Sequence, residues 1–303
     1  MEIKEKSLLF VYNPVSGKGL ILDSLGEILN LFTRRGYRVT VHPTASVGDG
    51  HDYIASNAVL YDEVCVSGGD GMLNEAVSAL LAVPEEHRPT LSYLPAGSTN
   101  DFASTVGIPT DPLMAANALE NAEAVRLDAG TLDSRGFAYV AAFGAFTDVA
   151  YDTPQDIKNV FGHLAYVIHG LAVLPSIREQ HLRVIHGDTV IEGDFLYGMV
   201  SNTKQVGGMK LTDPAISLAD GKFEVLLIKP PKNAAEMQTL IGAIVGRTFN
   251  SDCIVAFTAK EVTVESENPI SWTLDGEYGG ETTLANIQNH HLAYSLLIPK
   301  HDS

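Results

Sequence analysis

The first third of the chain alternates two hydrophobic patterns, and this alternation constrains the fold more than any other feature of the sequence. Short apolar runs, such as residues 7–12 and 63–67, are each followed by a stretch with apolar residues at helical spacing, such as residues 19–36 and 72–83. Patterns of the first kind are typical of buried strands, and those of the second kind are typical of amphipathic helices. Because strand–helix repeats of this length form parallel sheets, we predict an α/β domain.

From about residue 125 onward, the sequence consists of short apolar runs separated by Gly, Asp and Asn turns. This spacing is typical of antiparallel strands in a β-sandwich or barrel. Helical patterns interrupt the strands near residues 156–175 and 233–246, and a last apolar run at residues 291–300 is compatible with pairing on either domain. We therefore predict two domains of different class, an α/β domain followed by an antiparallel β domain.

The composition excludes several classes of protein. The 303 residues are 45% hydrophobic and 19% charged, which is a soluble globular composition with enough chain for two cores. A net charge of −17 without a cluster of Lys and Arg argues against a nucleic-acid partner. The two cysteines lack a CxxC spacing and the N-terminus has no signal-peptide pattern. The longest apolar stretch, residues 164–175, is too short to span a bilayer, so we expect a cytoplasmic protein.

Residues 67–71, with the sequence Ser-Gly-Gly-Asp-Gly, lie between a predicted buried strand and a predicted helix. Glycines leave backbone N–H groups exposed, and the helix N-terminus adds partial positive charge, so such a loop suits phosphate oxygens. Two familiar phosphate motifs do not match here. Asn74 occupies the third glycine position of G-x-G-x-x-G, and Tyr12 stands where a Walker A motif would begin before Gly17.

Asp70 is the informative residue of this loop. A carboxylate beside phosphates is repelled unless a cation bridges the two charges, and Mg²⁺ is the usual bridge. The alternative is that the Gly-Asp-Gly sequence forms only a turn, because Asp and Gly are common turn residues. Asp70 after a buried strand therefore favours metal-assisted phosphoryl transfer, with the turn as the open alternative.

Two further loops follow predicted strands in the first domain. Residues 94–104 contain Gly97, Ser98, Thr99, Asn100 and Asp101, which suit either phosphate binding or the capping of a helix by Ser98 or Thr99. The loop after the first strand contains Lys18, which suits either phosphate neutralisation or an ordinary exposed turn. Far along the chain, Asp275 and Glu277 lie in a stretch that by itself predicts a β-hairpin.

As a set, these motifs resemble the diacylglycerol kinase catalytic domain family. The matching stretches are residues 13–19, 67–77, 95–103 and 274–277, and their order and separations are highly specific. The similarity is greatest to the soluble bacterial lipid kinases, which are related to sphingosine kinases and more distantly to NAD kinases. It covers essentially the whole chain.

The resemblance implies two domains with ATP and lipid meeting in a cleft between them. The first is an α/β ATP-binding domain of residues 1–125 with a parallel sheet, to which residues from about 285–303 return. The second is an antiparallel β-sandwich lipid domain of residues 126–284. These limits are expectations from the family pattern.

The resemblance also implies roles for individual residues. Glu277 is expected to be the general base toward the acceptor hydroxyl, with Asp275 supporting the metal. Asp70 and Asp101 are expected to organise Mg²⁺ and the triphosphate. The residues expected to contact ATP are Asn13, Pro14, Val15, Ser16, Gly17, Thr44, Gly69, Asp70, Gly71, Met72, Leu73, Asn74, Glu75 and Ser98.

Residues 216–225 resemble the family's second, structural Mg²⁺ site, which would use Asp220 with backbone oxygens near Ser217 and Lys222. An ordinary Asp-Gly turn between strands is the alternative. One residue departs from the family pattern, because Met72 stands where Thr is usual after the Gly-Gly-Asp-Gly sequence. A hydroxyl contact to phosphate would be lost there unless the backbone N–H suffices.

We therefore predict an ATP- and Mg²⁺-dependent lipid kinase of phospholipid synthesis or turnover, acting on diacylglycerol or a related lipid. A lipid substrate implies transient contact with a membrane surface, and hence a peripheral cytoplasmic protein. Two alternatives stay open: a related kinase with a soluble substrate, such as an NAD kinase, and a catalytically weak nucleotide- or lipid-binding regulator, which only Met72 favours. A homodimer through a sheet edge also stays open.

Overall fold

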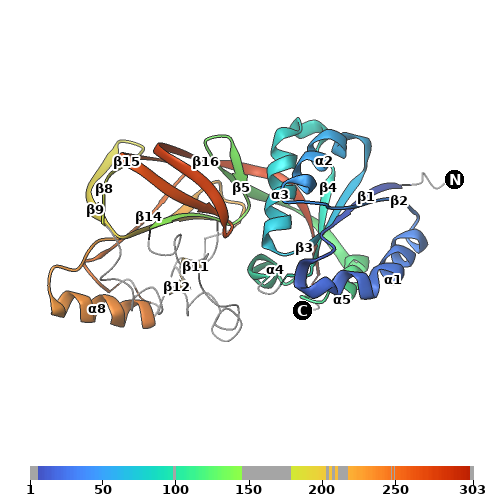
Figure 1. The fold of residues 1–303 in the computed structure, drawn as a ribbon, viewed down its shortest axis with the longest axis horizontal. Coiled ribbons are helices and arrows are strands. Elements are labelled where there is room, and N and C mark those ends of the chain that lie inside the picture. Colours follow the sequence, from blue (N-terminus) through green and yellow to red (C-terminus); the bar gives the residue numbers. More distant parts are fainter. Residues whose placement is uncertain are drawn as a thin grey trace. The chain divides into compact units, whose positions relative to one another are not determined.

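The computed structural model describes residues 6–97, 100–144, 179–202, 205–206, 209–210, 218–246, 248 and 250–300. The helix predicted near residues 156–175 lies outside these residues. The chain divides into two compact units (Figure 1). Unit 1 comprises Met1–Leu127 together with Leu292–Ser303, and unit 2 comprises Asp128–His291.

Unit 1 is an α/β unit built on a parallel sheet, which confirms the predicted fold class. With β16 (Glu277–Pro299) at one edge, the strand order is β16-β4-β3-β1-β2, and every neighbouring pair is parallel. Helices α1 and α5 pack together, as do α2 and α3. The elements are β1 (Lys6–Tyr12), α1 (Leu20–Arg34), β2 (Tyr37–Pro43), α2 (Asp49–Asn57), β3 (Glu63–Gly68), α3 (Asp70–Ala82), β4 (Thr90–Pro95), α4 (Asp101–Val106) and α5 (Pro112–Ala118), joined in part by single 3₁₀ turns.

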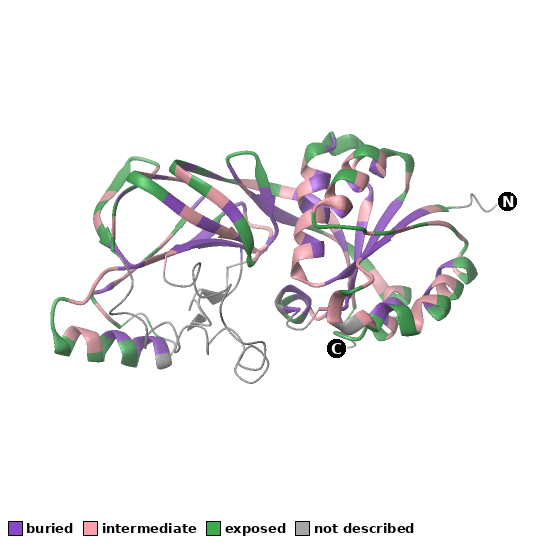
Figure 2. Ribbon diagram, in the orientation of Figure 1, coloured by how far each residue is buried: buried purple, intermediate pink, exposed green. Residues whose placement is uncertain are grey.

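Strands β3 and β4 are buried along almost their whole length, as Figure 2 shows. Parallel strands are covered by helices on both faces, and their sequences are accordingly near-continuous apolar runs. The first residue of β3, Glu63, is a carboxylate among these buried residues. It accepts hydrogen bonds from the hydroxyls of Tyr37 at 2.6 Å and Ser92 at 2.7 Å. Burial raises the pKa of Glu63, and these two donors oppose that rise.

Unit 2 is an antiparallel β-sandwich, again as predicted. Its core is a cluster of aromatic and branched side chains in which Phe143 and Trp272 pack edge to face at 5.0 Å and Phe137 stacks on Phe223 at 5.6 Å. Its elements are β5 (Ala122–Leu132), β6 (Arg135–Phe137), β7 (Val140–Gly144), β8 (Gln180–His186), β9 (Thr189–Phe195), β10 (Tyr197–Ser201), β11 (Gln205–Val206), β12 (Met209–Lys210), β13 (Phe223–Ile228), α8 (Ala234–Val245), β14 (Ile254–Ala259), β15 (Glu261–Leu274) and β16 (Glu277–Pro299). In the part of the chain that the structure describes, no helix is long and apolar enough to cross a membrane.

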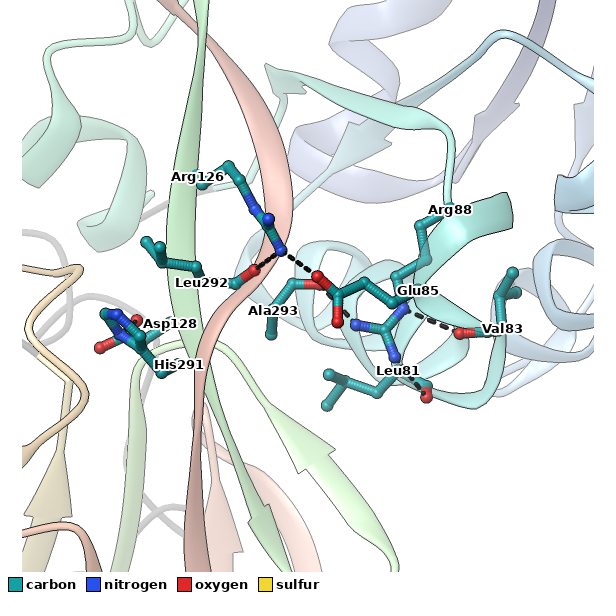
Figure 3. Close-up of polar contacts among 9 residues, drawn as sticks. All are labelled: Leu81, Val83, Glu85, Arg88, Arg126, Asp128, His291, Leu292 and Ala293. Atoms are coloured by element: carbon teal, nitrogen blue, oxygen red, sulfur yellow. Dashed lines mark hydrogen bonds and ion pairs between the residues drawn. The ribbon is translucent and has the colours of Figure 1, made fainter.

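Strands β5 and β16 pair with each other, and each runs from one unit into the other. On the unit 1 side, Arg126 donates to the carbonyl of Leu292 and to Glu85, the latter at 2.5 Å (Figure 3). Arg88 donates to the carbonyl of Ala293 at 2.6 Å. Two guanidinium groups therefore fasten β16 to unit 1 immediately after the boundary.

On the unit 2 side of the same boundary, the buried Asp128 holds His291. The carboxylate lies 3.0 Å from Nδ1 of His291 and accepts from the backbone N–H of Gly221 at 2.6 Å. The next residue, Leu292, has a φ of +50°, a left-handed conformation that is unusual for a branched side chain. The boundary thus coincides with a left-handed residue within β16.

Candidate functional site

The parallel sheet of unit 1 has its topological switch point between β1 and β3. Strand β1 leads through α1 to β2 on one side, whereas β3 leads through α3 to β4 on the other. Loops that leave neighbouring strands in opposite directions open a crevice at the carboxyl edge, where α/β proteins bind their ligands. The described residues of the loops after β1, β3 and β4, at 13–19, 69, 96–97 and 100, all lie at this edge.

Glycines allow these loops to pack backbone against backbone. Gly17 has a φ of +54°, and a Cβ there would lie 2.0 Å from the carbonyl oxygen of Ala96. The hydroxyl of Ser16 donates to the same carbonyl at 3.3 Å. A Cβ on Gly97 would lie 2.5 Å from Cα of Gly69. Only glycine fits at such contacts, so the three loops form one surface made largely of main chain.

The predicted ATP contacts before α1 and after β2 lie at this edge as well. Asn13 donates its N–H to the carbonyl of Ser67 at 2.9 Å, and its side-chain oxygen accepts from Val15 at 3.0 Å. Thr44 donates its N–H to the carbonyl of Tyr12 at 2.9 Å. The structure therefore places Asn13, Val15 and Thr44 at the ends of adjacent strands.

Asp70 is the first residue of α3 and connects two helices. Its Oδ1 accepts from the N–H of Phe102, in the first turn of α4, at 3.4 Å. Its charge also acts on Tyr93, whose pKa is raised well above the ordinary value by burial and then by Asp70. The hydroxyl of Tyr93 donates to the carbonyl of Gly68 at 3.1 Å. Asp70 thus lies between two helix N-termini, where partial positive charge favours an anion.

The loop before α4 is closed by Asn100, which precedes the helix with a φ of 51°. Its side-chain oxygen accepts from the N–H of Gly97 at 3.0 Å, and its amide donates to the carbonyl of Gly97 at 2.8 Å. The N-cap residue is therefore Asn100, whereas the sequence favoured Ser98 or Thr99. Both of these residues lie outside the described part of the chain, as does the side chain of Asp101.

Glu75 has a structural role that the sequence analysis missed. Its carboxylate accepts from the N–H of Gly48 at 2.9 Å and from that of His51 at 3.1 Å, at the start of α2. A Cβ at Gly50 would lie 2.7 Å from Oε2 of Glu75. The only sequence signal for this contact is Gly50, which leaves room for a side chain from α3.

Met72 and Leu73 turn their side chains into unit 1. Met72 is 6% exposed and Leu73 is 1% exposed. Met72 lies against two glycines, since a Cβ at Gly68 would be 2.6 Å from Cβ of Met72 and one at Gly50 would be 3.1 Å from its sulfur. The side chain of Met72 therefore packs between α3 and α2, and only its backbone could contact a ligand.

In unit 2, Asp275 and Gly276 form the two-residue turn of the β15–β16 hairpin. Their φ values are +50° and +91°, and Leu274 pairs with Glu277 across the turn. Two successive positive φ values define the turn type that Asp-Gly favours, as the sequence predicted. The side chain of Glu277 is exposed, and among the described residues it makes no hydrogen bond or ion pair.

The carboxylate of Asp275 is bound by three consecutive backbone N–H groups. Its Oδ2 accepts from Ala138 at 2.7 Å, and its Oδ1 accepts from Tyr139 at 2.9 Å and from Val140 at 2.8 Å. The N–H of Asp275 donates in return to the carbonyl of Val140 at 2.8 Å. No sequence pattern indicated this contact, because the partners are about 136 positions apart.

The predicted second metal site is described only in part. Asp220 accepts from the N–H of Lys222 at 3.0 Å, which is the geometry of a local turn, while Ser217 lies outside the described residues. Within the described ranges, no three His, Cys, Asp or Glu side chains gather to hold a metal. Mg²⁺ in phosphoryl transfer needs only one or two carboxylates, because phosphate oxygens and water complete its coordination. Asp70 at the glycine-lined edge fits that requirement.

Comparison with known proteins agrees with this arrangement. The model of the diacylglycerol kinase catalytic domain matches residues 7–132, and that of the YegS C-terminal NAD kinase beta sandwich-like domain matches residues 141–292. A protein from Bacillus subtilis named diacylglycerol kinase is 34% identical, over 91% of this chain and 91% of that protein. One of the same name from Staphylococcus saprophyticus is 30% identical over 94% of each. A crystal structure from Bacillus anthracis shares the fold with a TM-score of 0.81 at 22% identity, covering 98% of this chain and 97% of that one.

Proposed function

This chain belongs to the diacylglycerol kinase family and is a lipid kinase, and from that premise we propose that it transfers the γ-phosphoryl group of ATP to the hydroxyl of diacylglycerol or a closely related lipid, with Mg²⁺. The observation that carries the proposal is the main-chain surface where the loops after β1, β3 and β4 meet around Asp70. Such a surface offers N–H groups to phosphate and one carboxylate to a cation, which is what a nucleotide triphosphate requires.

We assign the ATP site to this edge of unit 1. The loop residues Asn13–Gly17 and Gly69–Glu75, with Thr44 and Ser98, would bind and orient the triphosphate largely through backbone groups. Met72 is no obstacle, because the side chain at that position packs into the protein. Asp70, together with Asp101, would hold Mg²⁺, which supplies neutralisation of the phosphate charge when bound. Glu75 would support the site by fixing the start of α2.

We assign the general base to Glu277. A carboxylate that removes the proton from the acceptor hydroxyl must itself be free of donors that would lower its basicity. Glu277 is exposed and unpartnered among the described residues, unlike Glu75 or Asp275. The lipid hydroxyl would give its proton to this carboxylate as its oxygen attacks the γ-phosphorus, and ADP would leave.

Two further proposals concern membrane contact and a second metal site. The protein would meet a membrane surface transiently as a peripheral cytoplasmic protein, since diacylglycerol resides in the bilayer. Asp220, with backbone oxygens near Ser217 and Lys222, would hold a second, structural Mg²⁺ in unit 2. This second site is tested by the dependence of unit 2 stability on Mg²⁺ in the absence of ATP.

The decisive experiment incubates the protein with radiolabelled ATP, Mg²⁺ and a panel containing diacylglycerol, monoacylglycerol, phosphatidylglycerol, a sphingoid base and NAD. We expect label in diacylglycerol or a close relative, and a loss of at least 100-fold in Asp70→Asn. Asp70→Asn keeps an oxygen for the N–H of Phe102 but loses the charge. Asp23→Asn, which changes an exposed acid of α1, is the matched control and should retain full activity.

The outcomes separate the alternatives. Label in NAD instead of a lipid would show a soluble-substrate kinase and overturn the lipid assignment. Magnesium-promoted ATP binding without any labelled product would point to a regulator. Unchanged turnover in Asp70→Asn would refute the assignment of the cation-binding carboxylate.

A further inference from the structure

We propose that Asp275 is a positioning residue that acts through Glu277, and that it does not bind the catalytic metal. The inference rests on the proposed function, since it takes Glu277 as the general base. Most of the lone pairs of the Asp275 carboxylate accept hydrogen bonds from within unit 2.

A carboxylate has two oxygens that together accept about four hydrogen bonds. In Asp275, Oδ1 accepts from Tyr139 and Val140, and Oδ2 accepts from Ala138, all between 2.7 and 2.9 Å. Three successive N–H groups that converge on one anion form a nest, and bonds to a charged acceptor are the stronger kind. These bonds take up three of about four positions, so a metal bound to either oxygen would compete with backbone donors for the same carboxylate.

The nest is anchored in the core of unit 2. It leads directly into β7, which pairs with β15 in the register Leu274 to Ala141 and Trp272 to Phe143. Phe143 and Trp272 are almost fully buried and pack edge to face. The position of Asp275 is therefore determined by a rigid sheet, and the side chain transmits that position to the turn.

The position of this turn determines the position of the Glu277 backbone. Asp275 is left-handed, its N–H donates to Val140, and Glu277 follows after one glycine and pairs with Leu274. With the carboxylate bonds in place, the hairpin tip is attached to residues 138–140 by four hydrogen bonds. Without them, the exposed tip would keep only the bond from the N–H of Asp275 to Val140 and its strand ladder, and small displacements of a catalytic group reduce rates steeply.

The chain contains a matched control for this residue. Asp133, in the β5–β6 hairpin of the same unit, is also left-handed, with a φ of 52°. Its Oδ1 accepts from the N–H and the side-chain amide of Asn286 at 3.1 and 3.3 Å. Asn tolerates the left-handed region as Asp does, so Asp→Asn at either position changes the carboxylate without straining the backbone.

The test compares Asp275→Asn, Asp133→Asn, Glu277→Gln and the double variant Asp275→Asn with Glu277→Gln in the full chain. The measurements are kcat, the Mg²⁺ concentration for half-maximal rate, the ATP affinity and the fluorescence emission of Trp272. Trp272 is the single tryptophan, so its emission reports the packing beside the turn. We expect Asp275→Asn to lower kcat about 100-fold, with the Mg²⁺ requirement, ATP affinity and Trp272 emission unchanged.

We further expect the double variant to match Glu277→Gln within about twofold, because residues acting as a unit are not additive. Asp133→Asn should retain wild-type kcat. An increase of tenfold or more in the Mg²⁺ requirement of Asp275→Asn, or an additive double variant, would overturn the inference. An unfolded Asp275→Asn would show in Trp272 emission, and Asp275→Gly, which also tolerates the left-handed backbone, then repeats the cycle. If wild-type protein labels no lipid, it is the proposed function that fails instead.

Discussion

The two units present carboxylates in opposite ways. In unit 1, Asp70 and Glu75 both accept hydrogen bonds from helix N-termini and lie within a surface shaped by glycines. In unit 2, Asp275 accepts three bonds from the backbone N–H groups of residues 138–140, which belong to no helix, while Glu277, two residues later, is exposed and unpartnered among the described residues. The comparison teaches that the residue type does not reveal the role. A carboxylate that accepts several backbone hydrogen bonds holds structure in place, and one without donors is available for proton transfer.

The largest expected effect is a loss of kcat when the unpartnered carboxylate of the hairpin is replaced. Glu277→Gln should lower kcat by about 10² to 10⁴-fold while ATP affinity stays unchanged, because the amide cannot accept the proton. Steady-state kinetics with a lipid substrate and a separate ATP-binding measurement check this. The control is Glu281→Gln, an exposed acid of the same strand. If both variants keep wild-type kcat, the unpartnered carboxylate is not the base.

The next effect tests the glycine surface of unit 1. Gly17→Ala should destabilise unit 1 by roughly 2 to 5 kcal/mol and weaken ATP binding, because a left-handed alanine would also meet the carbonyl oxygen of Ala96. Gly36→Ala is the control: its φ is +83°, but nothing lies within 4 Å, so about 1 to 2 kcal/mol is expected. Denaturant unfolding measures both. Equal losses in the two variants would show that backbone strain alone matters.

A smaller effect concerns the carboxylate that caps α2. Glu75→Gln should cost about 1 kcal/mol of stability, since one acceptor and the charge at the N-terminus of α2 are lost. Glu27→Gln, at an exposed position of α1, should cost nothing measurable in the same unfolding experiment. A loss of ATP affinity much greater than the loss of stability would show that Glu75 contacts the nucleotide directly.

The smallest effect belongs to the surface of unit 2. The hydrogen bond from His181 to Asp194 raises the pKa of His181 above 6.5, with Glu192 adding to the rise. The folded state therefore binds this proton more tightly than the unfolded chain does. The resulting stability is complete below about pH 6.5 and is lost as the pH rises through the folded pKa. His181→Asn should abolish this part of the pH dependence of the melting temperature, and an identical profile in both proteins would contradict it.

The sequence predicted what local patterns determine and missed what distant contacts determine. The fold classes of both units followed from hydrophobic periodicity, and the hairpin at Asp275 followed from its Asp-Gly pair. The cap of α2 by Glu75 and the nest around Asp275 were missed, because nothing near either residue in sequence marks its partner. The predicted domain limits and the roles of the site residues stay predictions.

The unit boundary at Leu292 has a consequence for biosynthesis. Residues Leu292–Pro299 complete the parallel sheet of unit 1 beside β4, yet the ribosome makes them after all of unit 2. Domains generally fold as units during translation, and the earlier one usually folds first. In this chain, the inserted unit 2 has its full set of strands before unit 1 does. A nascent chain arrested at residue 291 should therefore expose an open strand edge on β4, where chaperones would bind.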